Sequence, residues 1–140
     1  MDARLTIEPC LSALPKVADF LAKFACQHRI NADDQARVLI VLEELFTNLL
    51  KYGYRNGDGG RRVEIALGLE GTRLTIEFID NGLAFNPFAA TAADLERPVE
   101  ERAVGGFGLH LVRGLVEEAH YSRVNERNIM HLTRRVFFKD

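Results

Sequence analysis

Apolar residues recur with two different spacings along the chain, and the spacing separates helices from strands. Alternation over residues 4–8 predicts a short strand, whereas apolar positions over 12–28 recur every three or four residues and predict a helix. A second amphipathic helix is expected to start at Asn31, a good N-cap, and to stop near Gly53. Its first turn is acidic and includes Asp34, which suits a helix N-terminus.

The same alternation predicts four more strands, joined in pairs: 63–69 with 74–78, and about 119–124 with 129–137. A tight turn at Glu70-Gly71 joins the first pair, and residues 125–128 join the second. Between the pairs lie a long irregular connection over 86–104 and a glycine-rich helix start at Gly105. We therefore expect an α+β fold, a two-layer sandwich in which helices cover one face of a mixed, mostly antiparallel sheet.

The composition is that of an ordinary globular protein. The chain has 140 residues, of which 47% are apolar and 27% charged, so we expect one core and a single domain over 1–140. A net charge of −2 gives no electrostatic reason to bind nucleic acid. No apolar run approaches the roughly 20 residues of a membrane span, so we expect no membrane segment.

The start of the chain and its two cysteines bear on cellular location. Residues 1–10 lack a basic stretch followed by an apolar one, which is the pattern of a signal peptide. Cys10 and Cys26 lack the spacing of a metal-binding pair, and we expect both to be reduced and largely buried. These features favour a cytoplasmic protein by default.

The second helix carries the first candidate site. At about 100° per residue, Glu44, Asn48 and Lys51 fall on one polar stripe at the shoulder of the apolar face. A carboxylate and a carboxamide one turn apart can share a magnesium ion and a water or hydroxyl group. A solvated helix surface explains the same pattern, and the spacing alone does not decide between the two.

Two further sites follow in the chain. Asp80 continues the alternation of the preceding strand, so its carboxylate should point at the buried face, which is costly unless it meets a partner or a ligand. Gly82 behind it would let a flat ligand approach the backbone, although a strand-end aspartate can also simply start a turn. Residues 105–108 (GGFG) open a helix, where backbone N–H groups form a natural phosphate site or an ordinary cap.

Taken in order, the three sites resemble the N, G1 and G2 boxes of the GHKL superfamily of nucleotide-binding domains. Residues 44–48 (ELFTN) match the N box, 80–87 (DNGLAFNP) the G1 box and 106–109 (GFGL) the G2 box. The match spans nearly the whole chain, and the three motifs together are far more specific than any one. No Walker-type G-x-x-x-x-G-K-[ST] loop is present. The resemblance implies a Bergerat-type ATP-binding fold.

The resemblance implies roles in binding ATP and Mg²⁺. Asp80 would accept a hydrogen bond from the adenine amino group, Asn48 would coordinate the magnesium that bridges the phosphates, and Glu44 would act as general base. Backbone N–H groups at the G2 box would hold phosphates, and residues of about 88–105 would close as an ATP lid. The implied cofactor-binding residues are Asn48, Lys51, Asp80, Gly82, Phe85, Gly105, Gly106, Phe107, Gly108 and Leu109.

Within the superfamily the chain looks most like the serine kinases that act as bacterial anti-sigma factors. That likeness implies an ATP-dependent protein-serine kinase that phosphorylates a STAS-type anti-anti-sigma protein and alternately sequesters a sigma factor. Relatives of this kind are often homodimers, a state that the sequence neither supports nor excludes. Two other readings stay open, a regulatory binding module with little or no phosphotransfer and a general regulatory ATPase.

One departure from the family pattern affects the kinase reading. Many relatives carry His-Gly-Tyr after the N box, whereas this chain has Tyr52 in place of the histidine. A titratable imidazole is therefore missing near the phosphates. Lys51 could balance phosphate charge from its position beside Asn48, or it could simply face solvent. The kinase step is consequently a less direct inference than nucleotide binding.

Overall fold

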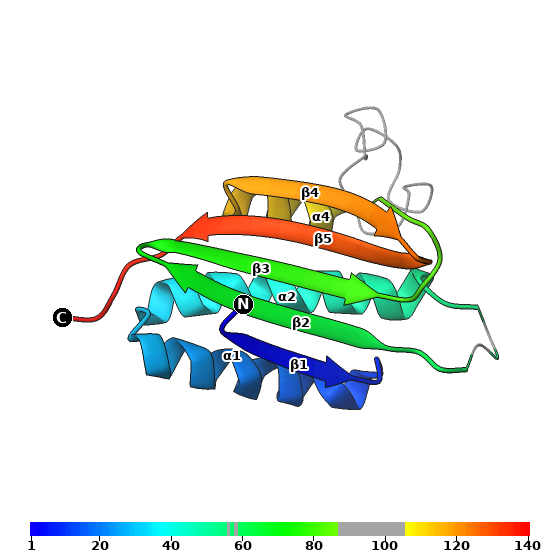
Figure 1. The fold of residues 1–140 in the computed structure, drawn as a ribbon, viewed down its shortest axis with the longest axis horizontal. Coiled ribbons are helices and arrows are strands. Elements are labelled where there is room, and N and C mark those ends of the chain that lie inside the picture. The colour runs from blue at the N-terminus through cyan, green and yellow to red at the C-terminus, as the bar shows by residue number, and fades with distance from the viewer. Residues whose placement is uncertain (56, 58, 87–105) are drawn as a thin grey trace.

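The computed structural model describes residues 1–55, 57, 59–86 and 106–140, apart from the side chains of 106–110. Its helices are η1 (Leu11–Ala13), α1 (Leu14–His28), α2 (Ala32–Tyr52) and α4 (Gly106–Leu115). Its strands are β1 (Ala3–Ile7), β2 (Val63–Glu70), β3 (Arg73–Asp80), β4 (Glu118–Val124) and β5 (Arg127–Arg135). Figure 1 shows that the C-terminal end of α2, the end of β3 and the β4–β5 turn all lie at the same end of the molecule.

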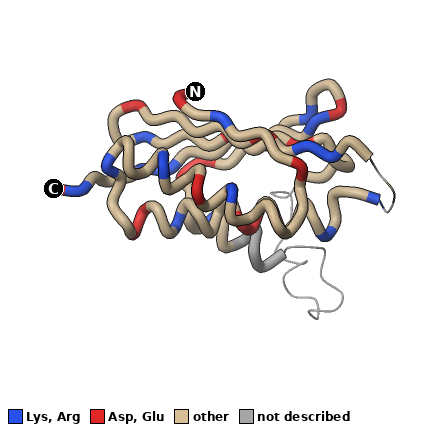
Figure 2. The backbone as a smooth tube through the Cα atoms, turned by 90° about the horizontal axis from the view of Figure 1, so that it is seen from below, with Lys and Arg blue, Asp and Glu red and all other residues tan. Residues whose placement is uncertain are grey.

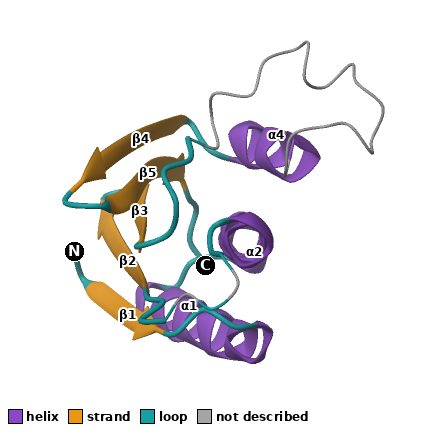
Figure 3. Cartoon of the chain, turned by 90° about the vertical axis from the view of Figure 1, so that its right-hand side faces the viewer, coloured by secondary structure: helices purple, strands orange, loops and turns teal. Residues whose placement is uncertain are grey.

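The strands form one sheet in the order β1-β2-β3-β5-β4, and all four described pairings are antiparallel. The helices α1, α2 and α4 lie on one face of this sheet, as the end-on view in Figure 3 shows. This arrangement confirms the predicted α+β sandwich with helices on a single face. Because the described helices cover only one face of the sheet (Figure 3), its strands alternate between core positions and positions that face away from the helices.

Local sequence explains where α1 and α2 begin. Pro15 falls in the first turn of α1, where its missing N–H would have had no helical partner. The side chain of Asn31 caps α2 by accepting a hydrogen bond from the backbone N–H of Asp34, with 2.8 Å between Oδ1 and N. The predicted start of α2 is confirmed, and its end at Tyr52, one residue before Gly53, agrees with the prediction as well.

The core lies between the helical layer and the inward positions of the sheet. Inward residues of β2, β3 and β5 meet apolar residues that recur at helical spacing on α1 and α2. Among the described side chains, Phe46 from α2 and Phe78 from β3 are the largest that are fully buried. Each large side chain removes enough apolar surface from water to contribute roughly 1.5–3 kcal/mol.

A buried ion pair joins the start of α2 to the end of β5. The Nη2 atom of Arg134 lies 2.9 Å from Oδ1 of Asp34, and the other oxygen, Oδ2, accepts a 2.8 Å hydrogen bond from the backbone N–H of Phe137. Arg134 also donates from Nη1 to the carbonyl of Leu115, the last residue of α4. The sequence suggested only a favourable charge at a helix N-terminus for Asp34. In the structure this residue instead fastens three elements together.

Two expectations from the sequence are wrong. Cys10 and Cys26 are both exposed free thiols rather than largely buried ones. Cys26 follows the buried Phe24 by two positions, which places it about 200° further around α1. The second strand of the last pair begins at Arg127 and not at 129, so Asn128 belongs to β5 and not to the turn. The turn itself consists of Asn125 and Glu126, which both have positive φ.

Charged residues of both signs are spread along the chain. Figure 2 shows basic and acidic residues interspersed along the backbone tube. None of the helices in the described ranges is long and apolar enough to cross a bilayer.

Candidate functional site

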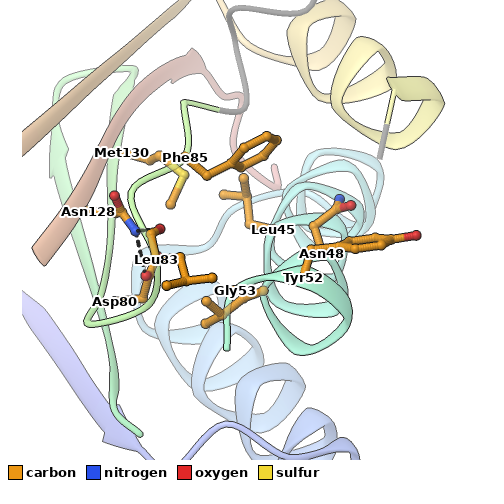
Figure 4. Close-up of a pocket in the computed structure, with 10 residues that line it drawn as sticks. Leu45, Asn48, Tyr52, Gly53, Asp80, Leu83, Phe85, Asn128 and Met130 are labelled. Atoms are coloured by element: carbon orange, nitrogen blue, oxygen red, sulfur yellow. Dashed lines mark hydrogen bonds between the residues drawn. The ribbon is translucent and has the colours of Figure 1, made fainter. Parts of the chain in front are cut away.

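A pocket opens where the C-terminal part of α2 meets the ends of the central strands. Most of its walls are apolar, and its polar side chains are few, as is usual for small-molecule sites. The lining residues are Leu45, Asn48, Leu49, Tyr52 and Gly53 of α2 and its C-cap, Asp80, Leu83 and Phe85 of β3 and the following turn, and Asn128 and Met130 of β5. Figure 4 shows Asp80 and Asn128 together on one side of the pocket and Asn48 and Tyr52 on the other.

Asp80 provides the buried charge of this pocket. It is the last residue of β3 and only 3% exposed, so the predicted inward direction of its side chain is confirmed. Its Oδ1 atom accepts hydrogen bonds from the backbone N–H of Gly82, at 2.8 Å, and from Nδ2 of Asn128, at 2.9 Å. Within the described part of the chain no group donates to the other oxygen, Oδ2, which is also not enclosed. Asp80 can therefore accept a hydrogen bond from a ligand.

Burial governs the titration of Asp80. Loss of solvent raises the pKa of this carboxyl above its ordinary value. The hydrogen bonds from Asn128 and Gly82 and the charge of Arg123 oppose that effect because they favour the ionised form. A carboxyl held in this way is costly to the free protein, and a donor from a ligand would reduce the cost.

Gly82 allows the turn after β3 to pack closely against the end of α2. A Cβ atom at this position would lie 2.6 Å from the carbonyl oxygen of Gly53 and 3.0 Å from Oδ1 of Asp80. The neighbouring Leu83 donates its backbone N–H to the same Gly53 carbonyl at 2.7 Å. Gly82 is not among the lining residues, so its evident structural role is to admit this close backbone contact; access of a ring to the pocket past Gly82 stays a prediction.

Of the three residues in the predicted polar stripe of α2, Asn48 lines the pocket. Glu44, which is half-buried, and the exposed Lys51 do not. Asn48 donates from Nδ2 to the carbonyl of Glu44 at 2.7 Å, which leaves its Oδ1 as an oxygen acceptor. Described residues include no cluster of three or more His, Cys, Asp or Glu side chains that could hold a metal. An amide oxygen suits Mg²⁺, which usually takes one or two protein ligands together with phosphates and water.

The third predicted site begins α4. Gly106 is its first residue, and the backbone of Gly106, Phe107, Gly108 and Leu109 forms its first turn, where N–H groups lack partners within the helix. Helix α4 packs beside α2, and both helices lie in the layer that covers one face of the sheet (Figure 3). The side chains of Phe107 and Leu109 are outside the description, as are Gly105, Pro87 and the proposed lid over 88–105.

Hydrogen bonds of Asn81 connect the segment after α2 to the end of β3, beside the pocket. Asn81, directly after Asp80, accepts from the hydroxyl of Tyr54 at 2.7 Å and from the N–H of Arg62 at 2.9 Å, and it donates to the carbonyl of Gly60 at 2.7 Å. Burial, with the nearby charge of Asp80, raises the pKa of Tyr54 to about 12, so its hydroxyl remains a donor. These contacts tie the segment after α2 to the end of β3.

The sequence did not identify Asn128 and Met130 as site residues. Both enter the pocket because β5 pairs with β3 in a register that sets Asn128 opposite Asp80. Asp80 and Asn128 are 48 positions apart in the sequence, so no local pattern indicates that the pairing register brings them together. Asn128, Met130 and Leu132 alternate toward the core, and this alternation is visible in the sequence once the last strand begins at Arg127 and not at 129.

The fold and the pocket together define a two-layer domain with a buried acidic acceptor at the edge of an apolar cleft. The histidine kinase-like ATPase domain family matches residues 7–134. The chain therefore belongs to this family, and the resemblance to the GHKL superfamily is confirmed.

Serine-protein kinases are among the curated relatives of the chain. Serine-protein kinase RsbW of Bacillus mycoides (strain KBAB4) is 32% identical over 91 residues, and RsbW of Bacillus cereus (strain G9842) is 31% identical over 91. Each match covers 61% of this chain and 55% of the relative, so the chain spans about half the length of the curated relatives it matches.

Two solved structures resemble the chain in fold. The RsbU and RsbW domains of Rv1364c from Mycobacterium tuberculosis match with a TM-score of 0.63 and 20% identity, over 96% of this chain and 32% of that one. The histidine kinase domain of the blue-light activated histidine kinase EL346 from Erythrobacter litoralis matches with a TM-score of 0.55 and 15% identity, over 89% and 60%. At these identities the likeness establishes the fold alone.

Proposed function

We propose that this protein is an ATP-dependent protein-serine kinase that acts as an anti-sigma factor in a partner switch. Its substrate would be a STAS-type anti-anti-sigma protein, and its location the cytoplasm. Membership of an ATPase domain family and the likeness to serine-protein kinases support the proposal. The observation that carries it is the buried Asp80, which keeps one carboxylate oxygen for a ligand at the edge of an apolar pocket.

The adenine base would occupy this pocket. Its amino group would donate to Asp80, and the apolar side chains of Leu49, Leu83 and Met130 would cover its ring. Phe85 is 43% exposed and Leu83 39% exposed in the free protein, so a bound base would also remove their surface from water. Affinity would then come from ring burial, and the choice of base from the hydrogen bond at Asp80.

The phosphates would extend from the base toward Asn48 and the first turn of α4. Asn48 would present Oδ1 to a magnesium ion, which supplies charge neutralisation for the transferring phosphoryl group. Backbone N–H groups at Gly106 and Gly108 would donate to phosphate oxygens at the positive end of α4. Glu44, one turn before Asn48, would accept the proton of the attacking serine hydroxyl.

A transfer assay tests the proposal. Incubation with γ-labelled ATP, Mg²⁺ and its cognate STAS-type anti-anti-sigma protein should label a serine of that protein. Glu44→Gln should abolish the label while nucleotide affinity is retained, because Glu44 lies outside the lining of the base pocket. Tight ATP binding by the unmodified protein without any transfer would contradict the kinase activity.

A second function is a nucleotide-dependent binding module with little or no phosphotransfer. One observation favours it, since Asn48 and Asp80 line the pocket whereas the proposed base, Glu44, does not. In that case nucleotide would only select between two protein partners. Glu44→Gln would leave partner exchange intact and Asp80→Asn would abolish it, which separates this function from the kinase.

A further inference from the structure

All hydrogen-bonding capacity of the Asn128 side chain is used inside the protein. Its Nδ2 donates to Oδ1 of Asp80 at 2.9 Å and to the carbonyl of Leu83 at 2.8 Å. Its Oδ1 accepts from the hydroxyl of Tyr121 at 2.6 Å and from Nη1 of Arg123 at 3.0 Å. A carboxamide has two N–H donors and two acceptor positions, so the four bonds saturate it. Turning the amide over would place its oxygen against two acceptors, Asp80 Oδ1 and the Leu83 carbonyl, and its NH₂ group against the Arg123 guanidinium. Only one orientation is therefore compatible with its neighbours.

This saturated amide fixes the turn that follows β3. Arg123 donates from Nη1 to the carbonyl of Gly82 at 3.1 Å as well, so Asp80, Gly82 and Leu83 are each held from β4 or β5. Asn128 is 3% exposed and directly opposite Asp80 in the sheet. Although it lines the pocket, it keeps no polar atom for a ligand. Its contribution must pass through Asp80.

We propose that Asn128 is a positioning residue that commits one oxygen of Asp80 to the protein and the other to the base, and thereby sets a preference for 6-amino over 6-oxo purines. The inference rests on the proposed nucleotide binding and extends it to the choice of base. With Gly82 and Asn128 both donating to Oδ1, only Oδ2 can meet a ligand. An ionised carboxylate oxygen accepts the amino group of adenine, whereas the carbonyl of a 6-oxo purine would set two acceptors against each other.

Loss of the amide would relax this choice in two ways. The carboxyl group could rotate, and it could bind a proton more readily, since Asn128 makes the largest of the contributions that lower the pKa of Asp80 against the effect of burial. A protonated carboxyl is a donor and pairs with a 6-oxo group. Other titratable or charged groups also lie near Asp80. Tyr54 after α2 and Arg123 on β4 interact with its charge, and Arg62 before β2, Glu64 on β2 and Arg127 on β5 line a second pocket beside it.

Binding calorimetry with ATP and with inosine triphosphate, each with excess Mg²⁺, tests the role of Asn128. The unmodified protein should prefer ATP. Asn128→Leu should weaken ATP binding by about tenfold or more, the effect of a lost hydrogen bond to a charged group, with little change for inosine triphosphate. Thr133→Val is the matched control because Thr133 is a buried polar residue of the same strand on the opposite face of the sheet. It should leave both affinities unchanged.

The isosteric Asn128→Asp provides a readout that a purely structural role would not give. At low pH one proton would bridge the new carboxyl and Asp80, which restores a donor to Oδ1; at higher pH two carboxylates would repel each other. The preference for ATP should therefore recover as the pH falls in this variant, whereas in the unmodified protein it weakens as the pH falls.

Three outcomes would overturn the role of Asn128. They are an unchanged ratio of ATP to inosine triphosphate affinity in a folded Asn128→Leu, an equal loss of both affinities, and an Asn128→Asp variant whose preference does not change with pH. If Asn128→Leu does not fold, the isosteric variant decides. Failure of the unmodified protein to bind ATP would refute the proposed function itself, and that result is distinguishable from any of these three.

Discussion

Replacement of Asp80 by asparagine separates the charge of this residue from its shape. The backbone N–H of Gly82 and the amide of Asn128 both require an acceptor at the position of Oδ1. The new side chain would therefore place its oxygen there and turn its NH₂ group toward the pocket. An acceptor for the base becomes a donor, and the buried charge disappears. The adenine amino group would then face another donor.

The expected loss follows from the burial of Asp80. At 3% exposure its hydrogen bond to a ligand is shielded from water, and a hydrogen bond to a charged group contributes about 1.5–3 kcal/mol. ATP should therefore bind about 10- to 150-fold more weakly to Asp80→Asn. Inosine triphosphate, whose 6-oxo group accepts from the new NH₂, should bind more tightly than to the unmodified protein.

The same substitution should not harm the fold. Both hydrogen bonds to Oδ1 are retained and the cost of burying a charge is removed, so the free energy of unfolding should stay equal or rise. Calorimetric titration with each nucleotide and urea denaturation without nucleotide measure the two effects. Asp19→Asn, the same chemical change at an exposed position of α1, serves as control. An unchanged ATP affinity in Asp80→Asn would show that the base does not donate a hydrogen bond to Asp80.

Three further predictions concern packing, charge and pH. Gly82→Ala should lower the melting temperature and weaken ATP binding, because its Cβ would lie 2.6 Å from the Gly53 carbonyl. Forced repacking of this kind costs about 1–3 kcal/mol. Thermal denaturation without and with nucleotide measures both effects. Arg134→Met should lower the free energy of unfolding by about 3–5 kcal/mol because it leaves the Asp34 carboxylate without its ion-pair partner. Arg4→Met, which breaks an exposed ion pair, should lower it by about 1 kcal/mol or less. Urea denaturation measures both. ATP binding, measured by calorimetry across pH, should weaken as the pH falls through the raised pKa of Asp80. The weakening should begin at a higher pH than for an exposed aspartate, whose pKa is about 3.9. An affinity that stays constant down to that pH would contradict an ionised acceptor.

Much of the fold could be predicted because its information is local. The spacing of apolar residues placed α2 between Asn31 and Gly53, and alternation along β3 aimed Asp80 at the core. Both follow from the geometry of a single element, which a short stretch of sequence determines. Asn48 and Asp80 could be chosen as site residues because they fall in motifs that resemble the N and G1 boxes, and the structure places both in one pocket.

The parts that could not be predicted depend on contacts between distant segments. Asn128 meets Asp80 through strand register, and Arg134 meets Asp34 across 100 positions. No periodicity within one element encodes such pairings. The exposure of Cys26 was missed for a different reason, since the tendency of free cysteines to be buried is only statistical and the direction of α1 overrode it.

A crystal structure with a non-hydrolysable ATP analogue and Mg²⁺ would show directly whether Asp80 binds the base. We expect the adenine amino group at a hydrogen-bonding distance of about 2.7–3.2 Å from Oδ2 of Asp80, with Oδ1 of Asn48 bound to the metal. A nucleotide bound elsewhere, or one whose base lies outside this pocket, would contradict adenine binding at Asp80.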